Sequence, residues 1–205
     1  MRGWGCDLVL VAALPGAATA RADDSQIGEE SVELTPFYGW RTGGSFTVVE
    51  GGAHYGISSS ASFGGLLDVS LHVNNFKLEA LFSHQDTDVE GLLAPALSHL
   101  TVDYYQAGIL QEIGNPKARF FVSALLGATH FAPARFASET RFSASLGAGL
   151  KLFPSRHVGI RVDARAYVTV VKGSSGLFCS GGCIFVYSGS ELWQGDFTGG
   201  IIFAF

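Results

Sequence analysis

The chain ends in the stretch Phe197-Thr198-Gly199-Gly200-Ile201-Ile202-Phe203-Ala204-Phe205, with apolar side chains at Phe197, Ile201, Phe203 and Phe205 in period two. This alternation, closed by an aromatic carboxy terminus, is typical of the last strand of an outer-membrane β-barrel. In hydrocarbon, only helices and closed barrels satisfy every backbone polar group. One strand of this kind therefore predicts a complete ring of strands.

The composition supports a membrane protein built from short segments. Of the 205 residues, 47% are hydrophobic and 15% are charged, whereas soluble domains carry about 25% charged residues. No run approaches the roughly 18 apolar residues that a membrane-spanning helix needs. The net charge of -5 and the lack of a basic stripe argue against nucleic-acid binding. No phosphate-binding glycine loop followed by Lys and Ser or Thr is present, and no cofactor is expected.

The amino terminus predicts a compartment. Arg2 precedes an apolar run over residues 8–14, and small residues follow as far as Ala22, which is the pattern of a cleaved secretory signal peptide. Cleavage fits after Ala20 or after Ala22, and Ala22 is favoured because two aspartates follow it. We therefore expect a signal peptide over residues 1–22 and one outer-membrane β-barrel domain over residues 23–205.

Alternation of period two predicts eight strands. The clearest case covers residues 140–152, where Phe142, Leu146 and Leu150 share one face and Arg141 and Lys151 the other. The full set is 31–42, 62–71, 76–85, 100–113, 118–131, 140–152, 158–170 and 193–205. Short turns (72–75, 114–117, 154–156) alternate with longer connections (43–61, 86–99, 132–138, 171–192), as in bacterial barrels. The sequence thus predicts an all-β fold, an eight-stranded antiparallel up-and-down transmembrane β-barrel.

The same alternation directs a mixed set of charges into the barrel. An eight-stranded barrel is just wide enough for side chains to fill it, so these groups are expected to pair into a polar plug. The alternative is a narrow passive channel, porin-like, for small solutes. The facing of 100–113 stays open, because Tyr104 and Tyr105 are adjacent. The predicted interior charges are Glu33, Arg41, Asp68, Lys77, Glu79, Arg119, Arg141, Lys151, Arg161, Asp163, Arg165 and Asp196.

Three other groups of residues suggest chemistry or anchoring. Cys179 and Cys183 are expected to form a disulfide in an external loop, and a metal site there is disfavoured because no His lies between 171 and 205. His84, His99 and His130, near external strand ends, raise the idea of a lipid hydrolase, but no compact His-x-Ser pairing lies on a strand. No catalytic residue, metal site or enzyme activity is therefore expected. Aromatic residues toward strand ends are expected at the membrane interfaces: Tyr38, Trp40, Tyr104, Tyr105, Tyr167, Trp193, Phe197 and Phe205.

With its opening strand Val32-Glu33-Leu34-Thr35-Pro36-Phe37-Tyr38-Gly39-Trp40, its glycine-rich strand over 143–150 and its terminal Phe205, the chain resembles the small OmpA/OmpX-like outer-membrane β-barrel families. The resemblance covers essentially the whole mature chain. It implies location in the cell outer membrane, with membrane lipid and lipopolysaccharide as surroundings. In such families the terminal aromatic strand is the signal read by the barrel-assembly machinery, a role that would fall here to Phe197, Phe203 and Phe205.

A fold of this kind does not decide the function. The sequence favours a monomer with a structural or surface-interaction role, whose external loops contact extracellular ligands. The passive channel comes second and a barrel lipid hydrolase third. A soluble lipocalin-like carrier comes fourth, because Arg161, Asp163 and Arg165 share one narrow face that a ligand cavity would have to bury.

Overall fold

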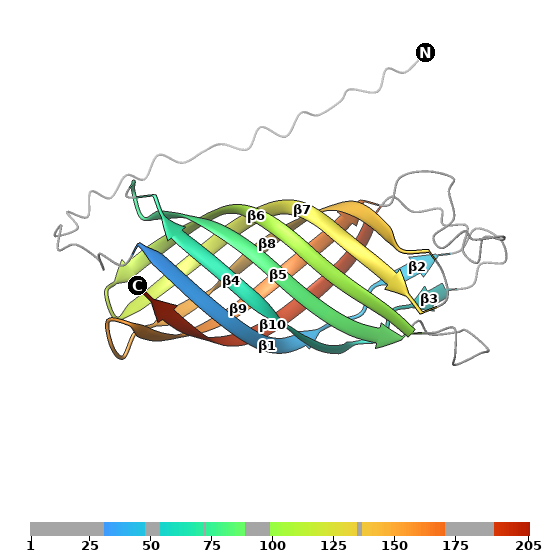
Figure 1. Cartoon of the computed structure of the whole chain (residues 1–205), viewed down its shortest axis with the longest axis horizontal. Helices are drawn as coiled ribbons and strands as arrows, with labels where there is room; N and C mark the ends of the chain where they lie inside the picture. Colours follow the sequence, from blue (N-terminus) through green and yellow to red (C-terminus); the bar gives the residue numbers. More distant parts are fainter. Residues whose placement is uncertain (1–30, 48–53, 72, 89–98, 135–136, 171–190) are drawn as a thin grey trace, which may run out of the picture.

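Eight long strands close into one antiparallel barrel in the computed structural model, which describes residues 31–47, 54–71, 73–88, 99–134, 137–170 and 191–205. Each strand pairs with its neighbours in the chain, and the last strand closes on the first (Figure 1). The barrel strands are β1 (Val32–Arg41), β4 (Ser60–Ser70), β5 (Phe76–Asp88), β6 (His99–Asn115), β7 (Ala118–Pro133), β8 (Glu139–Leu152), β9 (Val158–Val170) and β10 (Glu191–Ala204). The predicted fold class is confirmed.

The two ends of the barrel differ. One end, here called the turn end, carries the start of β1, the end of β10 and the three short turns (Figure 1). The opposite end, the hairpin end, carries a small hairpin of β2 (Ser45–Thr47) and β3 (His54–Gly56). This hairpin lies inside the connection 43–61, for which the sequence predicted only a loop. In the part of the chain that the structure describes, no helix is long and apolar enough to span a membrane.

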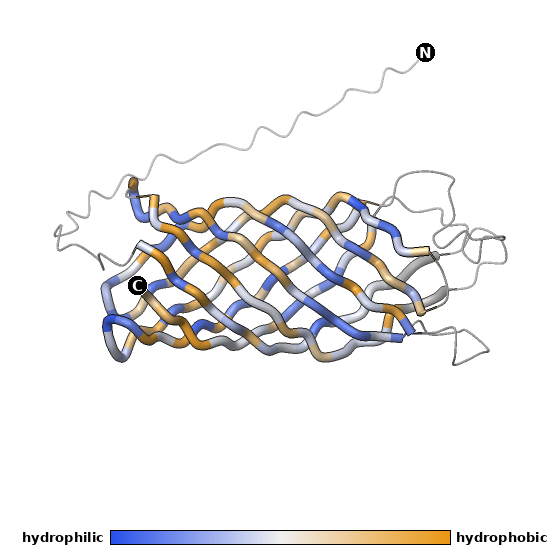
Figure 2. The backbone as a smooth tube through the Cα atoms, viewed as in Figure 1, coloured by the Kyte–Doolittle hydropathy of each residue, from blue (hydrophilic) through white to orange (hydrophobic). Residues whose placement is uncertain are grey.

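Alternation along each strand separates an apolar outer surface from a polar interior, and Figure 2 shows hydrophobic and hydrophilic residues alternating along the backbone tube. On β8, Phe142 and Leu146 are 56% and 68% exposed, whereas Ser143, Ser145 and Lys151 are buried. The open question on β6 is answered in the same way, because Tyr104 is fully buried and Tyr105 is 52% exposed. Exposed apolar side chains therefore cover the outside of the barrel wall.

The short turns set the register of the strands. Asn74 and Asn75 both have positive φ angles, 47° and 58°, and the Phe76 N–H donates to the Val73 carbonyl at 2.9 Å. Two residues with positive φ give the hairpin turn whose twist matches that of the flanking strands. At the next short turn, Asn115 Oδ1 accepts the N–H groups of Lys117 and Ala118 at 3.0 and 2.9 Å. Because one residue of slip would reverse every side chain, these turns help to decide which charges enter the barrel.

Candidate functional site

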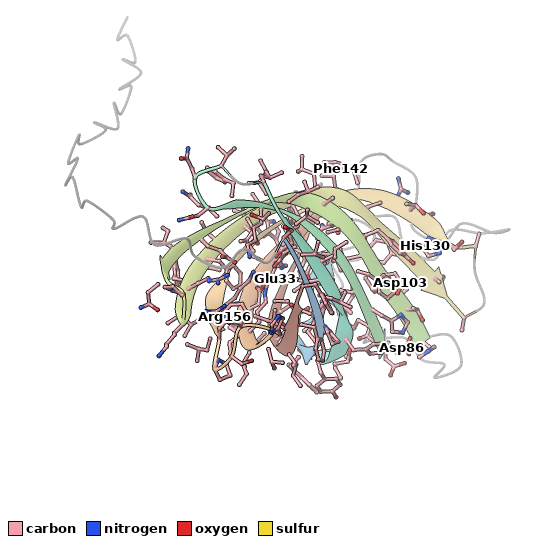
Figure 3. The ribbon with its side chains drawn as sticks, turned by 60° about the vertical axis from the view of Figure 1, so that its left-hand side comes forward. Glu33, Asp86, Asp103, His130, Phe142 and Arg156 are labelled. Atoms are coloured by element: carbon pink, nitrogen blue, oxygen red, sulfur yellow. The ribbon has the colours of Figure 1, made fainter. Side chains whose placement is uncertain are left out.

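The interior of the barrel holds charged side chains from all eight strands. None of them is more than 7% exposed, and among the described residues they comprise six carboxylates and six cations. Figure 3 shows Glu33 lying within the barrel. The set is Glu33, Asp68, Glu79, Glu112, Asp163 and Asp196 with Arg41, Lys77, Arg119, Lys151, Arg161 and Arg165. The buried charges therefore sum to zero.

Lys151, near the end of β8, contacts three of the carboxylates that lie toward the turn end. Its Nζ lies 2.6 Å from Glu33, 2.7 Å from Asp68 and 2.7 Å from Glu112. Lys77 also contacts Glu33, and its Nζ is 3.3 Å from Glu112. An ammonium group has three N–H donors, so three carboxylates satisfy Lys151 completely.

Two arginines of β9 extend these contacts across the barrel. Arg161 lies 2.6 Å from Glu79, 3.1 Å from Asp68 and 2.8 Å from Asp163. Arg165 lies 2.8 Å from Glu79 and 3.0 Å from Asp163. Together with Arg119, which lies 3.3 Å from Glu33 and 3.4 Å from Glu112, these groups form what we call the turn-side network. It contains five carboxylates and five cations: Glu33, Asp68, Glu79, Glu112 and Asp163 with Lys77, Arg119, Lys151, Arg161 and Arg165.

The remaining two charges pair with each other nearer the hairpin end. Arg41 lies 2.6 Å from Asp196, and Ser62 donates to the same carboxylate at 2.8 Å. The guanidinium group of Arg41 lies 4.8 Å from the ring centres of both Tyr104 and Tyr167. A guanidinium at this distance from an aromatic face is attracted to the ring. This Arg41–Asp196 pair is therefore neutral by itself, as the turn-side network is.

The position of Tyr104 and Tyr167 corrects one prediction. The sequence analysis assigned both to the membrane interface, but they are buried in the barrel with their ring centres 4.3 Å apart. Their hydroxyl-bearing rings pack against Arg41 because the alternation of β6 and β9 directs both inward. The other six aromatic residues of that prediction are 52% to 72% exposed: Tyr38, Trp40, Tyr105, Trp193, Phe197 and Phe205.

The structure brings eleven of the twelve predicted interior charges into these contacts. The exception is Arg141, whose side chain is 23% exposed and pairs with Glu139 at 2.6 Å near the hairpin end of β8. Glu112, which the sequence analysis did not include, occupies a central place beside Lys151. Its inward facing follows from that of Tyr104, because the two residues are an even number of positions apart on β6.

Buried apolar side chains lie at both ends of the interior. At the hairpin end, Leu100, Val102, Phe131, Leu192 and Ile57 are at most 4% exposed. Ile57 belongs to the connection between β1 and β4 and is held by its N–H, which donates to the Gly44 carbonyl at 2.7 Å. At the turn end, Phe153 and Ile202 are buried together, and Arg119 lies 4.4 Å from the ring centre of Phe153.

The three histidines of the hydrolase hypothesis lie at the hairpin end (Figure 3 labels His130, Asp86 and Asp103 there). His84 has Asp103 2.6 Å from Nδ1 and Asp86 3.3 Å from Nε2, so a carboxylate faces each ring nitrogen.

The other two histidines have different surroundings. His99 lies 3.9 Å from Asp86 and 3.9 Å from Asp88. His130 lies 3.0 Å from the hydroxyl of Thr140. Within the described ranges, no group of three or more His, Cys, Asp or Glu side chains is arranged to hold a metal ion.

Two predicted features lie outside the described residues, namely the signal peptide over residues 1–22 and the Cys179–Cys183 disulfide.

The aromatic residues predicted as an assembly signal lie on the outer surface of the carboxy-terminal segment. Phe197, Phe203 and Phe205 are 65%, 40% and 72% exposed.

Comparison with known proteins supports the fold. The sequence matches no protein-family model and no curated protein. Among solved structures, it is similar to the Neisserial surface protein A, NspA, with a TM-score of 0.56 at 9% identity over 85% of this chain and 97% of that one. It is similar also to the outer membrane protein OprG from Pseudomonas aeruginosa, with a TM-score of 0.54 at 12% identity over 87% and 98% of the two chains. The chain has the fold of these small barrels.

Proposed function

We propose that this protein is an integral outer-membrane β-barrel whose interior is a polar plug and whose role is structural or surface-interacting. The observation that carries the proposal is the buried, charge-balanced interior, in which Lys151, Arg161 and Arg165 each contact two or more carboxylates. Charges paired in this way fill the space that a conducting path would need. The working part of the molecule is then its outer surface and its external connections.

The outer surface supports placement in a membrane. Leu126, Leu146 and Val162 on three successive strands are 57% to 68% exposed, and a water-facing surface would leave this apolar area unburied at a cost of about 25 cal/mol per Å². Exposed Trp40 and Trp193 suit an interface between hydrocarbon and headgroups. The similarity in fold to outer-membrane barrels favours that membrane over others.

The proposed partners follow from this location. Membrane lipid and lipopolysaccharide would contact the outer wall, and the barrel-assembly machinery would read Phe197, Phe203 and Phe205. Extracellular ligands would meet the connections at the hairpin end. A monomer suffices, because the closed barrel leaves no strand edge for pairing with another copy.

Conductance in planar lipid bilayers tests the plug. We expect purified, folded protein to add no conductance steps above the bare bilayer. As a control, Glu79→Ser with Arg161→Ser removes one carboxylate and one cation, so the interior stays neutral but loses two large side chains. Conductance steps from this double variant, with a silent parent, would support the plug. Steps from the parent that change on Arg161→Gln would establish the channel alternative instead.

Location is tested separately, by fractionating expressing cells and comparing boiled with unboiled protein on a gel. A heat-dependent mobility shift in the outer-membrane fraction is expected from a folded barrel. Soluble periplasmic protein without a shift would overturn the membrane assignment and favour a carrier.

A further inference from the structure

The ladder between the first and last strands has a gap in its middle. Paired positions join Leu34 to Phe203 near the turn end and resume with Phe37 and Gly200. Thr35 and Pro36 have no paired position on β10, although both pair with β4 on their other side. The sum of the paired residue numbers is the same before and after the gap. The strands therefore do not slip, and the gap is a local loss of pairing.

Pro36 accounts for this gap. At both ends of β1, even-numbered residues donate their N–H to β10, since Val32 donates to the Phe205 carbonyl at 3.3 Å and Thr42 to the Gly195 carbonyl at 2.7 Å. In an antiparallel ladder, successive residues of a strand alternate: one points its N–H toward the neighbouring strand on one side, and the next points its N–H toward the strand on the other side. Pro36 occupies a donor position but has no N–H. The carbonyl of Ile201, opposite Pro36 in this register, lacks that donor.

The neighbouring side chain is also without a partner. Thr35 is fully buried in the barrel, and its Oγ1 makes no hydrogen bond to any described residue. By contrast, the ladder between β6 and β7 runs without a gap from Leu100 to Asn115. Unpaired backbone groups are avoided in hydrocarbon, where no water replaces the lost hydrogen bond. Missing backbone pairing and an unpartnered side chain therefore coincide at one point of the barrel wall.

We propose that the contact between β1 and β10 at Thr35 and Pro36 is a built-in opening point of the barrel wall. The two strands separate there locally, while β1 stays paired with β4 and β10 stays paired with β9. The opening faces the bilayer and does not depend on whether the interior conducts. It therefore goes beyond the proposed function and can fail or hold independently of it.

Amide hydrogen exchange tests this proposal, measured by nuclear magnetic resonance on the folded protein in phosphatidylcholine nanodiscs. Leu34 and Tyr38, the β1 donors on either side of Pro36, are compared with Ala107 and Ile109 in the middle of β6. Local opening predicts that the two β1 amides exchange at least about tenfold faster than the β6 amides. Equal protection at both places would overturn the proposal.

A substitution separates this local effect from global stability. Pro36→Ala restores the missing N–H, so the exchange of Leu34 and Tyr38 should slow by about tenfold relative to Ala107 and Ile109. Pro36→Val restores the same donor with a side chain suited to strands, and provides a second test if the alanine variant folds poorly. Leu78→Ala, on the outer face of β5, is the control and should leave the ratio unchanged. An unchanged ratio in both Pro36 variants would show that the missing N–H does not cause local opening.

Discussion

Lys151→Met is the most direct test of the turn-side network. Methionine keeps most of the length and packing of the lysine side chain but removes the ammonium group that contacts Glu33, Asp68 and Glu112 at 2.6 to 2.7 Å. The network then holds five carboxylates against four cations, all of them buried. Removing one partner of a buried ion pair typically costs 3 to 5 kcal/mol, because the other charge loses its compensation. We expect a loss of about 4 kcal/mol in the free energy of unfolding.

The measurement is urea unfolding of protein folded into lipid vesicles, followed by the fluorescence of the exposed Trp40 and Trp193. Arg141→Met is the matched control, since it also removes a cation at 2.6 Å from a carboxylate, but in a pair that is about one quarter exposed. Such pairs contribute about 0 to 1 kcal/mol. A loss for Lys151→Met no larger than for Arg141→Met would refute the argument that the network is desolvated.

A double variant tests whether charge balance is the cause. Adding Asp68→Asn to Lys151→Met leaves four carboxylates and four cations, and the new amide oxygen can still accept from Arg161, which lies 3.1 Å from Asp68. We expect the second substitution to recover about 2 kcal/mol, which is within the range of coupling energies for residues in one network. If the two losses simply add, lost packing rather than unbalanced charge explains the first.

Three further predictions concern changes at single residues. Tyr104→Leu removes a ring over Arg41 and the hydroxyl that donates to Gln194 at 2.7 Å, and should lower the free energy of unfolding by about 2 to 3 kcal/mol in the same assay. A Cβ at Gly44 would lie 2.2 Å from Leu192 Cδ1, so Gly44→Leu should cost about 1 to 3 kcal/mol, and a neutral result would show that the hairpin end is not tightly packed. Deleting Phe205 should lower the yield of heat-modifiable protein in the outer membrane relative to Leu126→Ala, and an unchanged yield would remove the assembly-signal proposal.

The sequence predicted the barrel well because its alternation is long and its turns carry local signals. Facing was ambiguous only on β6, where Tyr104 and Tyr105 are chemically alike. That single ambiguity also concealed Glu112, which shares its face with Tyr104. The hairpin of β2 and β3 was missed because strands of three residues are too short to show a period.

Depth and pairing could not be predicted in the same way. Alternation directs Arg141 inward, but the residue lies near the start of β8, at the hairpin end, and pairs with Glu139 instead of joining the turn-side network. Depth depends on the stagger of neighbouring strands around the barrel, which no single segment encodes. The pairs themselves join distant positions, since Arg41 and Asp196 are 155 positions apart in the sequence and Glu33 and Lys151 are 118 positions apart.

Charge balance inside the barrel bears on the register in which the strands close. Each strand contributes one to three buried charges, and only β1, with Glu33 and Arg41, and β5, with Lys77 and Glu79, are neutral by themselves among the described residues. A slip of one residue along a strand would move its buried charges to the outer wall and leave their partners unpaired. The two charges of β1 belong to different neutral groups, since Glu33 is part of the turn-side network and Arg41 pairs with Asp196 of β10. Among the described residues, the Arg41–Asp196 pair is the ionic contact that joins β1 to β10 directly, and it lies on the hairpin side of the gap at Pro36. Glu33, on the other side of that gap, is held by Lys77, Arg119 and Lys151 of other strands. The ionic contacts therefore fix both ends of β1 within the barrel and favour the register in which β1 closes on β10.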